Sequence, residues 1–486
     1  MSWLPAPGYW LSRFVFQRSL AVVYLIAFVV SANQFRPLIG ERGILPIPRF
    51  TRAVPFRRSP SLFHFHYSDR FFAAVTWLGI ALSVAALAGL TDRGPIWASM
   101  LSWAVIWALY LSIVNVGQTW YSFGWETLLL EAGFLAIFLG PAHVAPPTLV
   151  LWLLRWLLFR VEFGAGLIKL RGDPCWRDLT CLYYHHETQP MPNPLSWYFH
   201  HLPPRLHKIE VLANHFTQLV VPFALFAPQP VSGLAALVMI VTQSWLLLSG
   251  NFAWLNVLTI TIAIPALGDS LLHHPLPFSS PSSLSSPGWY EGLVIAVGIL
   301  IALLSYRPAR NLLSRRQLMN ASFDQLHLVN TYGAFGGITR VRREVIIEGT
   351  HDTTVTESTR WREYEFKGKP GDVRRRPPQI APYHLRLDWL MWFAGISPAY
   401  AQDWFGGLVV KLLEDDRATL RLLRVNPFTD APPTFVRARL YNYRFTTPEE
   451  HRRSGAWWER ELASEVLRPT RLDATPVGVP HDGDRA

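Results

Sequence analysis

Residues 231–249 read VSGLAALVMIVTQSWLLLS. The stretch contains no charged side chain. A helix of about 20 mostly apolar residues is long enough to cross the hydrocarbon core of a bilayer. We therefore predict a transmembrane helix here, and this prediction decides the class of fold.

Other stretches share this apolar character and comparable length. The further candidate spans are 14–33, 71–90, 96–116, 123–140, 148–170, 210–227, 252–268 and 289–306. The first of them lacks a clear signal-cleavage site, so we expect an anchored helix rather than a signal peptide. The chain is thus expected to cross the membrane about nine times, as an α-helical polytopic bundle.

The composition of the 486-residue chain agrees with a membrane protein. Charged residues make up 16% of it and hydrophobic residues 50%, whereas soluble domains carry about 25% charged residues. Disorder and a disulfide-dense scaffold are excluded, because the chain is apolar and has only 2 cysteines. The net charge of +11 suits an anionic membrane surface. We expect no nucleic-acid partner, since arginines flank apolar segments and no recognition motif is present.

No apolar run of spanning length follows Tyr306. We therefore divide the chain into a transmembrane domain, residues 1–306, and a soluble domain, residues 307–486. The second domain is expected to be mixed α/β and β-rich. Its predicted strands contain Val345–Ile347, Glu363–Phe366 and Phe435–Phe445, and its predicted helices are Leu385–Phe393 and Asp403–Leu423.

Charged residues within 148–170 form a regular pattern. Arg155, Glu162 and Lys169 are spaced by seven and so share one stripe of a helix. Charges at bilayer depth are costly unless they are paired or hydrated. We expect the stripe to face the bundle interior, opposite Glu126 and Glu131. It is either a polar cavity for a substrate or a structural ion-pair network.

The loop 171–209 is predicted to lie at the membrane interface. In an oxidising compartment Cys175 and Cys181 are close enough in sequence for a local disulfide, and a redox role is the alternative. The loop also carries His185, His186, His200, His201 and His207. We predict no metal site, because the cysteine spacing is not that of a zinc motif and adjacent histidines point apart. No soluble-enzyme motif occurs in the chain, and no cofactor is expected.

Four motifs carry a resemblance to a known family. Residues 172–181 read GDPCWRDLTC, residues 329–336 VNTYGAFG, residues 364–372 YEFKGKPGD and residues 382–393 PYHLRLDWLMWF. These motifs resemble the lipase maturation factor family, and the likeness extends from about residue 10 to 460.

This resemblance implies a folding factor, a chaperone of the endoplasmic reticulum membrane that helps secreted dimeric lipases to fold and assemble. Its soluble domain would face the lumen, or the periplasm for a protein of a bacterial inner membrane. A client would meet an exposed aromatic surface. Tyr383, Trp389, Trp392 and Phe393 are the candidates, with core packing as the alternative for each.

The charge distribution predicts the opposite orientation. The loop 34–70 is rich in arginine, and such loops stay in the cytoplasm. With nine spans the C-terminal domain would then be cytoplasmic as well. The resemblance and the charge rule thus disagree about the side of the membrane.

A second resemblance covers only the membrane half. Residues 163–170 read FGAGLIKL and are followed by Trp176. This is similar to a motif of vitamin K-dependent γ-carboxylases, which implies that Lys169 is a catalytic base. Arg155 and Glu162 would then tune its proton affinity. A membrane enzyme is therefore the alternative function, whereas a folding factor needs no catalytic residue.

Overall fold

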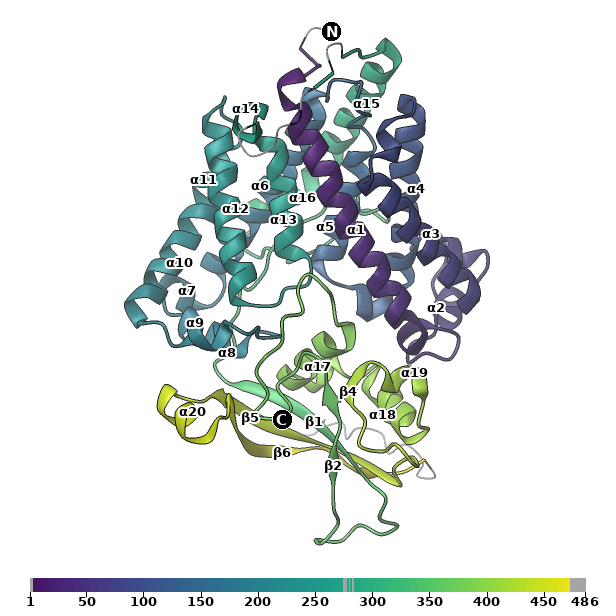
Figure 1. The fold of residues 1–486 in the computed structure, drawn as a ribbon, viewed down its shortest axis with the longest axis vertical. Helices are drawn as coiled ribbons and strands as arrows, with labels where there is room; N and C mark the ends of the chain where they lie inside the picture. Colours follow the sequence, from purple (N-terminus) through teal and green to yellow (C-terminus); the bar gives the residue numbers. More distant parts are fainter. Residues whose placement is uncertain (1–2, 274–277, 279, 282–283, 473–486) are drawn as a thin grey trace. The chain divides into compact units, whose positions relative to one another are not determined.

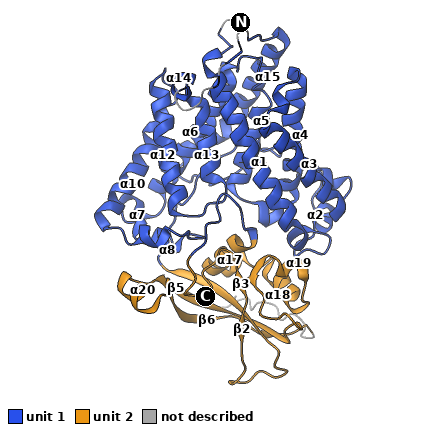
Figure 2. Cartoon of the chain, viewed as in Figure 1, with its two compact units in different colours: residues 1–340, 377–386 blue, residues 341–376, 387–486 orange. Residues whose placement is uncertain are grey.

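The computed structural model describes residues 3–273, 278, 280–281 and 284–472. Contacts divide the chain into two compact units (Figure 2). Unit 1 consists of Met1–Arg340 and Pro377–Arg386, and unit 2 of Val341–Arg376 and Leu387–Ala486. The first division therefore falls at 340 rather than at the expected 306. Residues 377–386 also return to unit 1, which an uninterrupted C-terminal domain did not anticipate.

Unit 1 is built of helices (Figure 1). Its longer helices are α1 (Trp10–Ile39), α3 (Asp69–Leu87), α4 (Ile96–Val116), α5 (Gly124–Ala136), α6 (Thr148–Arg171), α10 (Pro204–Leu219), α12 (Val231–Ser249), α13 (Leu255–Ala263) and α15 (Gly288–Leu304). Its shorter helices are α2 (Ile47–Ala53), α7 (Pro174–Arg177), α8 (Leu182–Thr188), α9 (Ser196–His200), α11 (Val221–Ala224), α14 (Asp269–Leu272) and α16 (Tyr306–Leu313).

Five helical segments of the described chain are long and apolar enough to cross a membrane. They are Pro7–Ile39, Asp69–Leu87, Ile96–Val116, Val231–Ser249 and Gly288–Leu313. Their outer faces are apolar: α12, for example, exposes Leu234, Val241 and Leu248. Exposed apolar side chains in such number suit contact with lipid. The predicted membrane bundle is confirmed.

The other four expected spans differ from that pattern for physical reasons. Helix α5 has 13 residues and α13 has 9, so neither reaches the roughly 30 Å of the hydrocarbon core. The span expected at 210–227 is broken, because α10 ends at Leu219 and Pro222 lies in the separate turn α11. Helix α6 is long enough, with 24 residues, but it carries the charged stripe.

Unit 2 contains a four-stranded antiparallel sheet in the order β2-β1-β5-β6. Its strands are β1 (Arg342–Thr350), β2 (Arg362–Glu363), β5 (Phe435–Phe445) and β6 (Trp458–Thr470). The short strands β3 (Glu365–Phe366) and β4 (Leu423–Val425) form a second sheet. The helices are α17 (Arg386–Ile396), α18 (Phe405–Leu413), α19 (Arg417–Leu420) and α20 (Pro448–Ser454).

Strand β5 has the bounds that its alternating sequence predicted. Its buried residues are Val436 and Ala438 before residue 440, and Tyr441, Tyr443 and Phe445 after it. The phase changes because the register to β6 shifts between Leu440 and Tyr441. A bulge of this kind rotates the following side chains to the other face.

Two parts of the C-terminal prediction differ from the structure. The helix expected over Asp403–Leu423 is divided, since Asp415 has a φ of 52° and Asp416 caps the new helix α19 through the Thr419 amide. A non-glycine residue in the left-handed region ends a helix. Strand β6 was not predicted at all. Most side chains of β6 are exposed, so its sequence has no alternation of apolar and polar residues that would reveal a strand.

Helix α17 lies against β1 at Gly395. A Cβ atom there would lie 2.5 Å from the Arg343 carbonyl oxygen. We expect Gly395→Ala to destabilise unit 2 by about 1–3 kcal/mol, because the backbone of β1 cannot move aside without cost. Gly406→Ala is the matched control. Gly406 has open space around it in α18, so alanine there should be neutral or slightly stabilising. Thermal unfolding in detergent compares the two, and equal melting temperatures would contradict the contact.

Candidate functional site

The segment that follows α6 is fixed against residues 335–340 of the same unit. The Asp173 amide donates to the Gly336 carbonyl over 2.8 Å, and Arg340 Nη2 pairs with Asp173 Oδ1 at 2.7 Å. Gly172 permits this approach, because a Cβ atom there would lie 2.1 Å from the Gly336 oxygen. Two motifs that are far apart in sequence thus form one substructure.

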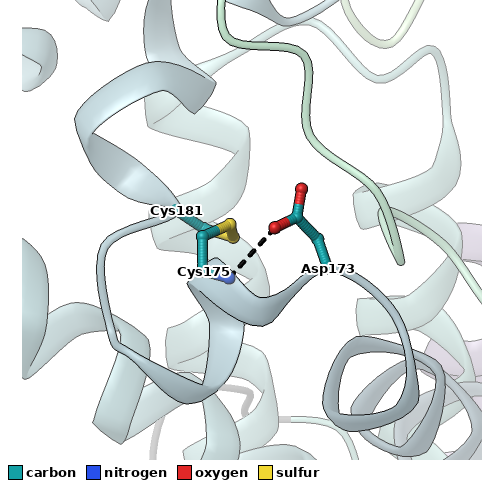
Figure 3. Close-up of side chains that lie close together, drawn as sticks. All are labelled: Asp173, Cys175 and Cys181. Carbon is teal, nitrogen blue, oxygen red and sulfur yellow. Dashed lines mark hydrogen bonds between the residues drawn. A yellow bond between two sulfur atoms is a disulfide. The ribbon is translucent and has the colours of Figure 1, made fainter.

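A disulfide joins Cys175 and Cys181 within this substructure (Figure 3). The Cys175 amide donates to Asp173 Oδ1 over 3.0 Å. Both cysteines are buried beside Trp176, whose indole donates to the Phe335 carbonyl over 2.8 Å. Sulfur atoms bonded to each other supply neither a thiolate nucleophile nor a metal ligand. The disulfide closes a short loop of this substructure, and the redox role of the two cysteines stays a prediction.

The carboxylate of Glu131 on α5 organises the second motif. Arg160 Nη2 pairs with Glu131 Oε1, and Glu131 Oε2 accepts hydrogen bonds from the Asn330 amide at 3.0 Å and the Tyr332 hydroxyl at 2.8 Å. All four residues are buried. Gly164 admits the segment, because a Cβ atom there would lie 2.3 Å from the Tyr332 carbonyl oxygen. Breaking such a buried pair costs about 3–5 kcal/mol, so this network holds residues 330–332 on the bundle.

A second carboxylate of α5, Glu126, binds the start of α17. Arg386 Nη1 donates to Glu126 Oε1 over 2.8 Å, and the Arg386 guanidinium lies 3.4 Å from the Tyr121 ring centroid. The Tyr110 hydroxyl also bonds to this carboxylate. The Arg386 amide donates to Gln34 Oε1 over 3.0 Å. Arg386 is therefore part of unit 1 in its contacts.

Residues 377–386 reach this position through Asn251. The amides of Ile380 and Ala381 both donate to Asn251 Oδ1 over 2.8 Å. Asn251 Nδ2 in turn donates to the Pro378 carbonyl over 2.9 Å. A single buried side chain thus satisfies three backbone groups of the segment, which fixes its path across unit 1.

The stripe residues Glu162 and Lys169 share one polar network with amides of α10 and α12. Lys169 Nζ donates to Asn214 Oδ1 over 2.7 Å and to Gln218 Oε1 over 2.9 Å. Glu162 accepts from Gln243 over 2.7 Å and from Gln218 over 3.3 Å. The structure therefore brings two of the three proposed catalytic residues together, with neutral amides between them.

The stripe does not face the carboxylates of α5. Arg155, its third member, donates to the Tyr9 hydroxyl over 2.9 Å. Glu126 and Glu131 have the arginine partners described above, so the structure differs from the expectation on this point. A cavity of about 510 Å³ in unit 1 is lined elsewhere, by Arg58, Ser59, Val114, Asn115, Gln118, Tyr121, Ser122, Phe123, Thr127, Asn320, Ser322, Phe323, Asp324, Gln325 and His327.

Unit 2 has a buried charged cluster of its own. Glu344 pairs with Lys369 at 3.0 Å and with Arg342 at 2.6 Å. Asp388 Oδ1 accepts a hydrogen bond from the Gly368 amide over 2.5 Å. Burial lowers the pKa of Lys369 to about 8 and raises the pKa of Asp388 to about 6. Gly368 thus anchors the first turn of α17, while Lys369 pairs with β1.

The four aromatic residues proposed for client contact fall into different environments. Tyr383 belongs to unit 1 and is half-buried. Trp389 is buried in unit 2, whereas Trp392 and Phe393 are half-buried there. The Phe393 ring lies 5.2 Å from that of Tyr400, which is exposed. Core packing therefore describes Trp389, and an aromatic surface forms around residues 392–400.

Comparisons with known proteins match both parts of the chain to one family. A model of the lipase maturation factor transmembrane domain matches residues 11–274, and one of the lipase maturation factor C-terminal domain matches residues 328–468. The chain belongs to the lipase maturation factor family. Human lipase maturation factor 1 is 42% identical, over 96% of this chain and 88% of the human protein. Rat lipase maturation factor 2 is 30% identical, over 94% of this chain and 83% of the relative. No solved structure matches.

In this member of the lipase maturation factor family, the residues of the family motifs hold distant segments of the chain together. Sequence reasoning identified VNTYGAFG as a motif but assigned no role to Asn330 or Tyr332. It also left Arg386 without a partner. Their positions in long, specific motifs were the available signal, but only the fold reveals Glu131 and Glu126 as their partners.

The shifted pKa of Asp388 predicts a pH dependence of stability. Its pKa rises from a usual value of 3.8 to about 6 in the folded chain. The folded state therefore holds this proton more tightly than the unfolded state does, so its contribution is complete below about pH 4 and is lost as the pH rises to about 6. Asp388→Asn keeps the acceptor for Gly368 but does not titrate. We expect the variant's melting temperature to vary less between pH 4 and 6; parallel curves would contradict the assignment.

Proposed function

We propose that this chain is a membrane-bound maturation factor that assists the folding or assembly of secreted lipases. Its family membership and its membrane-spanning helices support this function. Unit 2 would lie outside the cytoplasm, in the endoplasmic reticulum lumen of a eukaryote or the periplasm of a bacterium. There it would meet clients before or during their release.

The Cys175–Cys181 disulfide is the observation that carries the orientation. Disulfides persist in oxidising compartments, whereas the cytosol keeps thiols reduced. The loop that holds this disulfide contacts residues 335–340 within unit 1. Unit 2 begins at the next residue, Val341. Chain continuity therefore favours the same, oxidising side for unit 2.

By the charge rule, the arginine-rich loop 34–70 would lie in the cytoplasm. The contacts of this loop nevertheless support a position on the same side of the membrane as residues 377–386. Gln34, at the end of α1, donates to the His384 carbonyl over 2.7 Å. This contact supports one side of the membrane for the loop and for residues 377–386. The charge rule is a statistical preference, whereas a disulfide depends on the redox state of its compartment. We therefore give the disulfide more weight.

The aromatic surface around residues 392–400 is the proposed client contact. Partly folded proteins expose apolar side chains, and aromatic residues supply much of the binding energy at interfaces. Trp392 and Phe393 are accessible in part, while Tyr400 is exposed. Such a surface needs no catalytic residue. We expect no cofactor in this function.

A reporter fused after Ala486 tests the orientation. In a bacterial host, alkaline phosphatase is active only outside the cytoplasm, while a fluorescent protein exported unfolded stays dark. We expect phosphatase activity without fluorescence, because unit 2 follows the disulfide-bonded loop to the oxidising side. Each reporter is the control for the other at the same position. Fluorescence without phosphatase activity would contradict this orientation.

Co-expression with a secreted dimeric lipase tests the function. Cells that lack their own maturation factor should secrete active lipase only with this chain. We expect Trp392→Ala with Phe393→Ala to lower lipase activity per secreted molecule at least about tenfold, since two interface aromatics are lost. Leu462→Ala with Val466→Ala is the matched control, because both residues are exposed on β6. Equal activity for the two double variants would contradict the proposed surface.

Lys169→Arg distinguishes the alternative membrane enzyme. Arginine keeps the charge and the hydrogen-bond donors of Lys169. Its guanidinium group stays protonated, so it cannot accept a proton as a base. A folding factor with this substitution should still restore active lipase. Loss of rescue, with the variant present in the membrane at the normal level, would favour intramembrane chemistry with Lys169 as the base.

A further inference from the structure

Three potential metal ligands converge between α8 and α10. His186 lies on α8, and His207 and Glu210 lie one turn apart on α10, which packs against α8 (Figure 1). One ligand atom from each residue lies within 4.8 Å of the other two. An i, i+3 pair on a helix directs two side chains to the same face. This is the juxtaposition that adjacent histidine pairs in the sequence did not suggest.

In the part of the chain that the structure describes, the two ring nitrogens of His186 are buried without the hydrogen bonds that usually accompany buried polar atoms. The residue is only 3% exposed, and neither of its ring nitrogens has a hydrogen-bond partner among the described residues. Burying an unsatisfied polar group costs about 1–3 kcal/mol. The His186 ring lies 5.6 Å from the His207 ring, centroid to centroid. Its polar atoms are therefore buried beside the other two ligands.

The contacts of His207 also fit a bound cation. Its Nδ1 atom lies 3.1 Å from Glu210 Oε2, and its Nε2 atom lies 3.4 Å from the His200 carbonyl oxygen. Both neighbours are hydrogen-bond acceptors, yet a neutral imidazole carries only one N–H group. A neutral ring therefore leaves one contact without a proton, and either a second proton on the ring, paired with Glu210, or a metal ion supplies the missing positive charge. A metal ion at Nδ1 and Oε2 resolves this, with Nε2–H donating to the carbonyl.

The other oxygen of Glu210 is already oriented. Trp245 Nε1, on α12, donates to Glu210 Oε1 over 3.0 Å. Outer hydrogen bonds of this kind orient the first ligands of a metal. The His200 carbonyl plays the same role for His207. The cluster therefore has both ligands and the groups that orient them.

We propose that His186, His207 and Glu210 bind one zinc ion. Two imidazoles and a carboxylate form a ligand set that zinc accepts, with a water molecule in the fourth position. Zinc–nitrogen bonds of about 2.0–2.1 Å require the side chains to close by small rotations. The ion ties α8 to α10. This site goes beyond the proposed function and does not depend on it.

Zinc content tests the proposal on the full-length protein, purified in detergent through a tag without histidine. We expect one equivalent of zinc per chain by mass spectrometry of the metal. His186→Phe keeps an aromatic ring but removes the ligand, and Glu210→Gln keeps the acceptor for Trp245 without the charge. Each should weaken zinc binding at least about tenfold. His66→Ala, at an exposed histidine, is the control and should keep the zinc.

Two further readouts separate binding from folding. Cobalt substituted for zinc should give the visible absorption of a four-coordinate site, and His186→Phe should abolish it. A chelator should lower the melting temperature of the wild type but leave that of His186→Phe unchanged. A wild-type protein that binds no zinc in competition with a weak chelator would overturn the proposal. So would His186→Phe with the same zinc affinity as His66→Ala.

Discussion

Two buried carboxylates on α5 constrain much of unit 1. Burying a carboxylate is costly, and a cationic partner with further hydrogen bonds offsets that cost. Glu131 obtains these from Arg160 and from residues 330–332, and Glu126 obtains them from Arg386. Both pairings draw distant segments onto the bundle. For this reason residues 328–340 and 377–386 belong to unit 1, although residues of unit 2 lie between them in the sequence.

The same pairings explain why the family motifs are long and specific. In GDPCWRDLTC, VNTYGAFG and PYHLRLDWLMWF, the side chains with the closest contacts hold other parts of the chain. Gly172 permits close approach of the Gly336 backbone, Asp173 and Arg386 form ion pairs, and the disulfide closes the loop. A folding factor needs a stable frame and a surface for its client.

The sequence predicted the class of fold well and its charged contacts poorly. The membrane helices, the strand over Phe435–Phe445 and the helix from about residue 385 were predicted. The break at Asp415 and the exposed strand β6 were not, because neither leaves a periodic apolar pattern. The stripe of Arg155, Glu162 and Lys169 was recognised, but its amide partners on α10 and α12 were not. Only adjacent pairs of histidines were considered from the sequence. The cluster instead combines His186 of α8 with His207 and Glu210 of α10.

The sequence by itself determined that this protein enters a membrane and belongs to its family. Both follow from the local chain, since apolar length and motif residues are read along the sequence. Only the tertiary structure decided which charges pair, where the units divide and which histidine meets which carboxylate. Those outcomes depend on contacts between segments that are separated in sequence, from 29 residues for Arg160 and Glu131 to 260 for Arg386 and Glu126. The periodicity of the sequence cannot predict these contacts, because the partner of each buried polar group depends on which segments the folded chain brings together.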